Sequence, residues 1–267
     1  MNFSANLGFL FTELALPDRI RAAKAAGFSA VECHFPYSTP PAEISAALRE
    51  TELSMLGLNT VPGDVLAGDF GLAAVPGREQ DARDAIDMAV RYGAAIGAGN
   101  VHVMAGKTDA GAQADTTYRA NLKYACDVAA TAGLNILIEP INHRDVPGYH
   151  ISRVEQAADL IGALALPNLR LMFDCYHTQI MQGDLTERLR RHMDVIGHIQ
   201  IAAVPDRGEP DDGEVHYPNL IAAIREMGFT GPIGAEYKPR GRTTEEGLGW
   251  LSAYDEVNAQ SPSTAAA

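Results

Sequence analysis

Oxygen-bearing side chains end four successive apolar segments in the second half of the chain. These residues are Glu139, Asp174, Gln200 and Glu236. Any one of them alone is explained as an ordinary loop or capping residue, but four in succession are not. Three carboxylates that converge cannot all stay ionised unless a cation lies among them. Oxygen ligands favour Mg²⁺ or Mn²⁺, and a set without cysteine argues against structural zinc, so the residues predict a divalent metal site.

Three further residues are candidates for binding a substrate at the same place. His177 lies on the predicted loop after Asp174, where it can donate a hydrogen bond to a developing oxyanion. Arg207, on a later loop, has the planar fork that holds a carboxylate with two hydrogen bonds, and Lys107 is a second candidate for binding an anion. The alternative for Arg207 is a solvated arginine among the acidic residues around it, which are Asp206, Glu209, Asp211 and Asp212.

The remaining polar residues near these segments have more ordinary interpretations. His102 lies within a predicted strand and is interpreted as a core histidine with a satisfied ring. Glu32 is expected to support a metal ligand from behind, and His34, at the same predicted edge, is left without a role. His143 and His150 flank a loop and are interpreted as surface residues.

The elements that must position these residues repeat along the chain. A helical pattern, a glycine that caps it, a short apolar strand and a polar residue recur, with Gly27, Gly133 and Gly228 as the caps. The apolar runs do not alternate with polar residues, as expected for parallel strands that are buried on both faces. Strands are predicted to start near Phe3, Ala30, Ser54, Asn100, Asn135, Leu169, Ile196 and Pro232. Helices are predicted near Pro17–Ala26, Pro41–Thr51, Gln80–Tyr92, Ala112–Ala132, Val154–Ile161, Leu185–His192 and Pro218–Met227.

About eight such units predict an α/β fold, a (β/α)8 TIM barrel whose active site lies at the carboxyl ends of the strands. An open doubly wound sheet is the alternative, and the absence of a G-x-G-x-x-G turn after the first strand argues against it. The length of 267 residues suits one domain over 1–257, and the small polar stretch 258–267 is interpreted as a disordered tail.

Composition limits which partners and which cellular compartment are expected. The net charge of −13 makes nucleic acid and anionic membranes poor partners, and no segment is long enough to span a membrane. The N-terminus lacks the basic flank of a signal peptide, and three cysteines without paired spacing suit the reducing cytoplasm. The expected partner is a small molecule, and the sequence is compatible with a homo-oligomer.

Four segments of the chain carry a resemblance to a known family: Ile138-Glu139-Pro140-Ile141-Asn142, Phe173-Asp174-Cys175-Tyr176-His177-Thr178-Gln179, His198-Ile199-Gln200-Ile201-Ala202 and Gly234-Ala235-Glu236-Tyr237-Lys238-Pro239. With these segments the chain resembles the hydroxypyruvate isomerase family of the xylose-isomerase-like barrel superfamily. The resemblance runs through nearly the whole chain, and Gln200 stands where sugar epimerases of the superfamily usually have a histidine. It implies that Glu139, Asp174, Gln200 and Glu236 bind the metal and that Glu139 and Glu236 form the acid/base pair.

The expected activity is the metal-dependent isomerisation of hydroxypyruvate to tartronate semialdehyde through an enediolate. An isomerase of four-carbon 2-oxo acids, such as 2-oxo-tetronate, or an epimerase of neutral ketoses would use the same four ligands. An apurinic-site endonuclease is a more distant alternative, because it needs a histidine-rich zinc site and a basic surface. A sugar-acid binding protein without activity leaves the two carboxylates on one metal unexplained.

Overall fold

Nine short parallel strands form one sheet in the order β3-β2-β1-β9-β8-β7-β6-β5-β4. The computed structural model of the chain describes residues 2–252 and 254, so the predicted tail and the last residues of the predicted domain lie outside the described residues. The strands are β1 (Phe3–Asn6), β2 (Ala30–Glu32), β3 (Ser54–Met55), β4 (Gly57–Asn59), β5 (Asn100–His102), β6 (Asn135–Ile138), β7 (Leu169–Asp174), β8 (Ile196–Ile201) and β9 (Ile233–Ala235).

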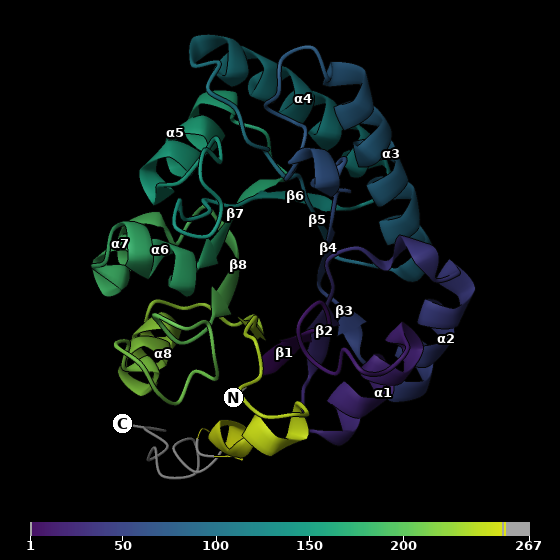
Figure 1. Cartoon of the computed structure of the whole chain (residues 1–267), viewed down its shortest axis with the longest axis vertical. Helices are drawn as coiled ribbons and strands as arrows, with labels where there is room; N and C mark the ends of the chain where they lie inside the picture. Colours follow the sequence, from purple (N-terminus) through teal and green to yellow (C-terminus); the bar gives the residue numbers. More distant parts are fainter. Residues whose placement is uncertain (1, 253, 255–267) are drawn as a thin grey trace, which may run out of the picture.

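The two ends of this order, β3 and β4, are halves of one predicted strand. Only Leu56 separates them, and its backbone N–H donates to the carbonyl of Val31 in β2 over 2.7 Å. Because β3 pairs with β2 and β4 pairs with β5, the sheet closes on itself around a central axis (Figure 1). The prediction of an eight-stranded barrel is therefore confirmed, with a one-residue interruption in its third strand.

The helices lie outside the ring of strands, as Figure 1 shows. Every predicted helix is present, with ends shifted by a few residues, and no helix in the described part of the chain is long and apolar enough to cross a membrane. The helices are α1 (Leu16–Ala25), α2 (Pro41–Thr51), α3 (Glu79–Ile96), α4 (Ala112–Thr131), α5 (Val154–Leu164), α6 (Cys175–Met181), α7 (Leu185–His192) and α8 (Tyr217–Glu226), with short 3₁₀ turns η1 (Pro36–Ser38), η2 (Val65–Ala67) and η3 (Glu245–Gly247).

One prediction about these elements is wrong. His177 was expected on a loop, but it lies in α6, a helix that begins directly at the end of β7. The side chain of Asp174 caps this helix by accepting a hydrogen bond from the backbone N–H of Tyr176 over 2.7 Å. The segment of seven residues was too short to show a helical period, and capping by the adjacent strand residue stabilises the start of the helix.

The strands lie between two buried faces, which explains their apolar runs. In β6 the side chains of Ile136, Leu137 and Ile138 are all buried, although neighbouring residues of a strand point to opposite faces. The glycine caps before β6 and β9 adopt left-handed backbone angles, with φ of 70° at Gly133 and 91° at Gly228. The chain thus turns sharply from each outer helix into the barrel wall.

The four predicted metal ligands lie at the carboxyl ends of adjacent strands, as expected. Asp174 is the last residue of β7, and Gln200 is its direct partner in the register of β8. Glu139 and Glu236 immediately follow β6 and β9. Because β6, β7, β8 and β9 are consecutive around the barrel, the four side chains share one arc of its rim.

Candidate functional site

Four buried side chains form a compact acidic cluster at this rim. Glu139, Asp174, His177 and Glu236 each offer an atom, and these atoms all lie within 4.8 Å of one another. Gln200 is also buried, at 2% exposure, and lies beside Asp174 in the sheet register. The structure therefore brings together three of the predicted ligands with His177 and places the fourth next to them.

Both oxygens of Glu236 are engaged by hydrogen bonds. Asn6 Nδ2 and His34 Nε2 donate to its Oε1 over 2.8 and 2.9 Å. Arg207 Nη2 donates to its Oε2 over 2.6 Å. Burial raises the pKa of Glu236, but Arg207 and His34 outweigh burial and hold that pKa well below its usual value.

Glu139 and Asp174 lie in a different environment. Glu139 Oε1 and Asp174 Oδ2 are buried, and neither has a hydrogen-bond partner among the described residues. Burial, with the neighbouring carboxylates Glu236 and Asp174, raises the pKa of Glu139 well above its usual value. Burial and Glu236 likewise raise the pKa of Asp174 to about 7, against the opposing effect of Arg207.

The unpartnered oxygens show that these residues fit a divalent cation. A buried polar atom without a partner costs about 1–3 kcal/mol, and a bound cation removes that cost. Gln200 Oε1 is a third buried oxygen without a partner in the described part of the chain. Three of the four predicted ligands thus have a buried oxygen without a partner among the described residues.

His177 is positioned as a hydrogen-bond donor. Asn142 Nδ2 lies 2.6 Å from His177 Nδ1, and the amide of Asn142 is oriented because the backbone N–H of Asp145 donates to its Oδ1 over 2.7 Å. His177 Nδ1 therefore accepts, and in the neutral ring the proton is on Nε2. Nε2 lies 3.5 Å from Asp174 Oδ2 and 3.8 Å from Glu139 Oε1. Burial and then Arg207 lower the pKa of His177 to about 3, which keeps the ring neutral.

Arg207 lies inside the site rather than in a solvated loop. Its guanidinium carbon lies 5.0 Å from the centre of the Phe9 ring and 4.8 Å from that of Tyr176, so the group is held between two aromatic faces. Its Nη2 is also 3.6 Å from Asp174 Oδ2. The surrounding acidic residues pair with Arg240 instead: Asp206, Glu209 and Asp211 each lie within 3.3 Å of its guanidinium.

The other predicted residues have mixed outcomes. Lys107 is exposed, and none of its described contacts joins it to the acidic cluster. The interpretation of His102 as a satisfied core histidine is wrong, because neither ring nitrogen has a hydrogen-bond partner among residues 2–252 and 254, and Nδ1 lies 3.6 Å from Glu139 Oε2. His143 is exposed as expected, whereas His150 is partly buried beside Asp115.

A cavity of about 190 Å³ lies directly over the cluster. Its wall combines Glu139, Glu236, His177 and Arg207 with apolar side chains. The apolar residues are Phe9, Phe35, Phe70, Met104, Ile141 and Val146. Drug-sized ligands occupy pockets of about 300–1,000 Å³, so this cavity suits a molecule of a few carbons.

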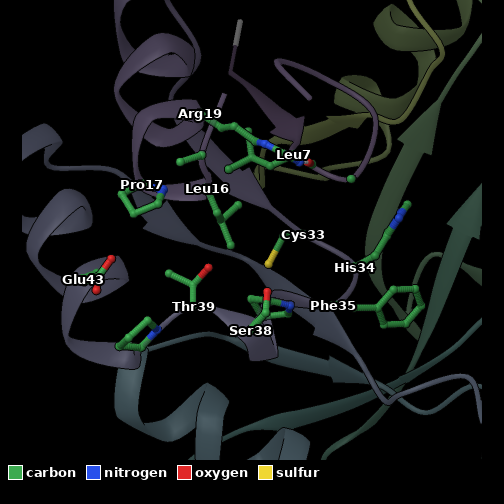
Figure 2. A pocket seen from close by; sticks show the side chains of 14 residues that line it. Leu7, Leu16, Pro17, Arg19, Cys33, His34, Phe35, Ser38, Thr39 and Glu43 are labelled. Carbon is green, nitrogen blue, oxygen red and sulfur yellow. Dashed lines mark hydrogen bonds between the residues drawn. The ribbon is translucent and has the colours of Figure 1, made fainter. Parts of the chain in front are cut away.

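A larger hollow of about 500 Å³ lies on the other side of His34, between the first two loops of the barrel (Figure 2). It does not contain the acidic cluster. Arg19 lines it, but the guanidinium of Arg19 is taken up by the backbone carbonyls of Leu7, Thr12 and Leu14. The chemistry of the site therefore lies in the smaller cavity.

Sequence reasoning assigned no role to several residues that complete the site. Asn6 and His34 hold Glu236, Asn142 sets the ring of His177, and Phe9 and Tyr176 hold Arg207. Asn6 and His34 were detectable as polar residues at or just after the ends of β1 and β2. Their partners lie more than 200 positions away, so the chain alone does not reveal the pairing.

The sequence of the chain matches a known family of proteins. The family model described as xylose isomerase-like TIM barrel matches residues 20–254. The chain belongs to this family. It is 46% identical over 255 residues to the 2-oxo-tetronate isomerase of Cupriavidus necator, and the match covers 94% of this chain and 98% of the relative. It is 40% identical over 257 residues to the hydroxypyruvate isomerase of Escherichia coli, covering 95% and 99%.

A solved structure of this barrel family has nearly the same fold. The crystal structure of AP endonuclease, family 2, from Brucella melitensis has a TM-score of 0.91 and 40% identity, and the match covers 95% of this chain and 98% of that one. The predicted resemblance to the hydroxypyruvate isomerase family is thus confirmed over nearly the full chain, and with it the prediction of an isomerase.

Proposed function

We propose that this isomerase moves the carbonyl group of a short 2-oxo acid between C2 and C3, with hydroxypyruvate as the first candidate and tartronate semialdehyde as its product. The observation that carries the proposal is the pair of buried carboxylates, Glu139 and Glu236, lining one small cavity with Arg207. Relatives at 40–46% identity are named for reactions on such acids.

The reaction requires the transfer of one proton between carbons, from C3 to C2, and of one proton between oxygens, from the C3 hydroxyl group to the oxygen on C2. A base removes a proton from C3, which carries the hydroxyl group, and an enediolate forms. A proton is then delivered to C2, and the carbonyl group is left at C3. Glu139 and Glu236 serve as the acid and base, because each is a titratable group in the wall of the cavity.

Glu139, Asp174, Gln200 and Glu236 are the residues that would hold Mg²⁺ or Mn²⁺. When bound, the cation supplies Lewis-acid stabilisation of the negative charge that develops on the substrate oxygens. The free buried oxygens of Glu139, Asp174 and Gln200 support this part of the proposal.

Two residues orient the substrate. His177 Nε2–H, fixed by Asn142, donates to a substrate oxygen near Glu139 and Asp174. Arg207 binds the substrate carboxylate: its Nε–H is buried without a hydrogen-bond partner among the described residues, so it has a donor to offer. The flanking Phe9 and Tyr176 rings limit how far the guanidinium can move.

The four-carbon acid 2-oxo-tetronate is the second candidate substrate. The relative at 46% identity is named for it, and both acids require the same proton transfer. Incubation with hydroxypyruvate, 2-oxo-tetronate or a neutral ketose in ²H₂O with Mg²⁺ or Mn²⁺, followed by NMR, tests the proposal. Isomerisation and deuterium exchange with an acid are expected. Turnover of the ketose alone favours an epimerase, and turnover of none removes the proposal.

We propose further that the chain works on small molecules in the cytoplasm and does not bind nucleic acid. The net charge of −13 and the three free, buried cysteines support this. Retention on a DNA column at low salt would contradict it.

A further inference from the structure

A buried hydrogen-bonded group lies beneath the acidic cluster, inside the barrel. At its centre is Glu32, the last residue of β2, which is only 5% exposed. Gln200 Nε2 and His198 Nε2 donate to Glu32 Oε2 over 3.1 and 2.9 Å. Ser4 Oγ donates to the other oxygen, Oε1, over 3.3 Å.

The carboxylate of Glu32 determines which way the amide of Gln200 points. A carboxylate only accepts hydrogen bonds, so the NH₂ group of Gln200 faces Glu32 and the carbonyl oxygen Oε1 is turned away from it. That oxygen is buried without a partner among the described residues, and Gln200 is the register partner of Asp174 in the sheet. With the amide reversed, an NH₂ group would take its place, and an N–H donor cannot bind a cation.

Strand β9, which lies beside β8 in the sheet, leaves room for the carboxylate of Glu32. A Cβ atom at Gly234 of β9 would lie 2.2 Å from Glu32 Oε1 and 2.9 Å from His198 Nε2. The backbone of Gly234 is not in the left-handed region, so the glycine is explained by space rather than by conformation. A buried carboxylate is expensive to desolvate, and an apolar residue there would avoid that cost, which indicates a role other than packing.

We propose that Glu32 is a positioning residue that fixes the amide of Gln200 with its carbonyl oxygen available to a divalent cation. The proposal rests on the metal centre of the proposed function. It assigns Glu32 no contact with the substrate: its effect passes entirely through Gln200.

A double-mutant cycle read by Mn²⁺ binding tests this directly. Calorimetric titration of the full chain with Mn²⁺ alone, without substrate, is compared for wild type, Glu32→Gln, Gln200→Leu and the double variant. An amide at position 32 brings its own NH₂ group and no longer forces Gln200 into one orientation. Loss of a group that orients a metal ligand typically weakens metal binding about 10–100-fold, and a loss of that size is expected for Glu32→Gln.

The cycle separates orientation from general damage. Because Glu32 acts through Gln200, the double variant should bind Mn²⁺ no more weakly than Gln200→Leu. Losses that multiply in the double variant would overturn the proposal. Ser4→Ala is the matched control, since it removes a contact of Glu32 without touching Gln200, and its Mn²⁺ affinity should stay within about twofold of wild type. An equal loss in Ser4→Ala would also overturn the proposal.

Two further outcomes are decided by the same experiment. If Glu32→Gln does not fold, as judged by circular dichroism, Glu32→Asp replaces it in the cycle, because the shorter side chain withdraws the carboxylate from Gln200. A wild type that binds no Mn²⁺ refutes the metal centre of the proposed function and this proposal with it. A wild type that binds Mn²⁺ while the losses multiply refutes the role of Glu32 alone.

Discussion

The two sides of the reaction cavity present the same chemical group in opposite surroundings. On one side, Glu236 receives hydrogen bonds on both oxygens from Asn6, His34 and Arg207. On the other, Glu139 Oε1 has no hydrogen-bond partner in the described part of the chain. His177 Nε2 lies 3.8 Å from this oxygen, and His102 Nδ1 lies 3.6 Å from Oε2.

This contrast shows that residue type does not determine how a carboxylate behaves. Both side chains are buried, yet their pKa values are displaced in opposite directions. Hydrogen bonds and the Arg207 guanidinium stabilise the charge of Glu236, whereas at Glu139 burial and the neighbouring carboxylates outweigh the effect of Arg207. Two carboxylates whose environments differ in this way are suited to different roles, one as the acid and one as the base.

Removal of divalent metal should have the largest effect, because the proposed cation would be held by carboxylates from both sides of the cavity. Dialysis against a chelator is expected to abolish turnover of hydroxypyruvate, and added Mg²⁺ or Mn²⁺ should restore it. The measurement is the NMR assay on treated and reconstituted enzyme. Full activity in metal-free protein would show that the two carboxylates work without a metal.

Replacing each carboxylate by its amide should have the next largest effect. Glu139→Gln and Glu236→Gln keep an oxygen but lose the titratable group, and each should lower kcat by at least about a hundredfold, the range of general acid–base catalysis, with a smaller change in KM. Glu187→Gln, on an exposed stretch of α7, is the control and should behave as wild type. A loss of about tenfold or less in both variants would remove them as acid and base.

Arg207→Met tests whether the Glu236 side of the cavity also selects the substrate. Loss of a charge-assisted hydrogen bond costs roughly 1.5–3 kcal/mol, so the preference in kcat/KM for keto acids over neutral ketoses should fall about ten- to a hundredfold. Lys107→Met is the matched control, and kcat/KM should stay within about twofold. An unchanged preference in Arg207→Met would contradict the role of Arg207 as the carboxylate clamp.

Asn142→Leu should have the smallest effect. It tests whether His177, on the Glu139 side of the cavity, acts as a hydrogen-bond donor or as a metal ligand. It frees His177 Nδ1, so the ring is no longer held with its proton on Nε2, and kcat should fall about tenfold, or ~1.4 kcal/mol. Mn²⁺ affinity, measured by titration, should not change, because His177 acts as a donor. A marked loss of Mn²⁺ affinity would instead identify His177 as a metal ligand.

The barrel and its four oxygen-bearing rim residues were predictable because they depend on local patterns. Apolar runs without alternation mark strands that are buried on both faces, and the residue that ends each run lies at the rim in any closed parallel barrel. The same rule placed Glu139, Asp174, Gln200 and Glu236 together. It gave no information on helix α6, whose start depends on the side chain of Asp174 acting as a cap.

The hydrogen bonds that give the rim residues their different surroundings depend on closure of the barrel. Asn6 and Glu236 are 230 positions apart and Glu32 and Gln200 are 168 apart, and both pairs meet only because β1 lies between β2 and β9 in the closed sheet. The sequence thus determined which functional groups reach the rim, since strand pattern is local. Which oxygen of each group is bonded and which is free depends on contacts across the barrel, and only the tertiary structure decides those.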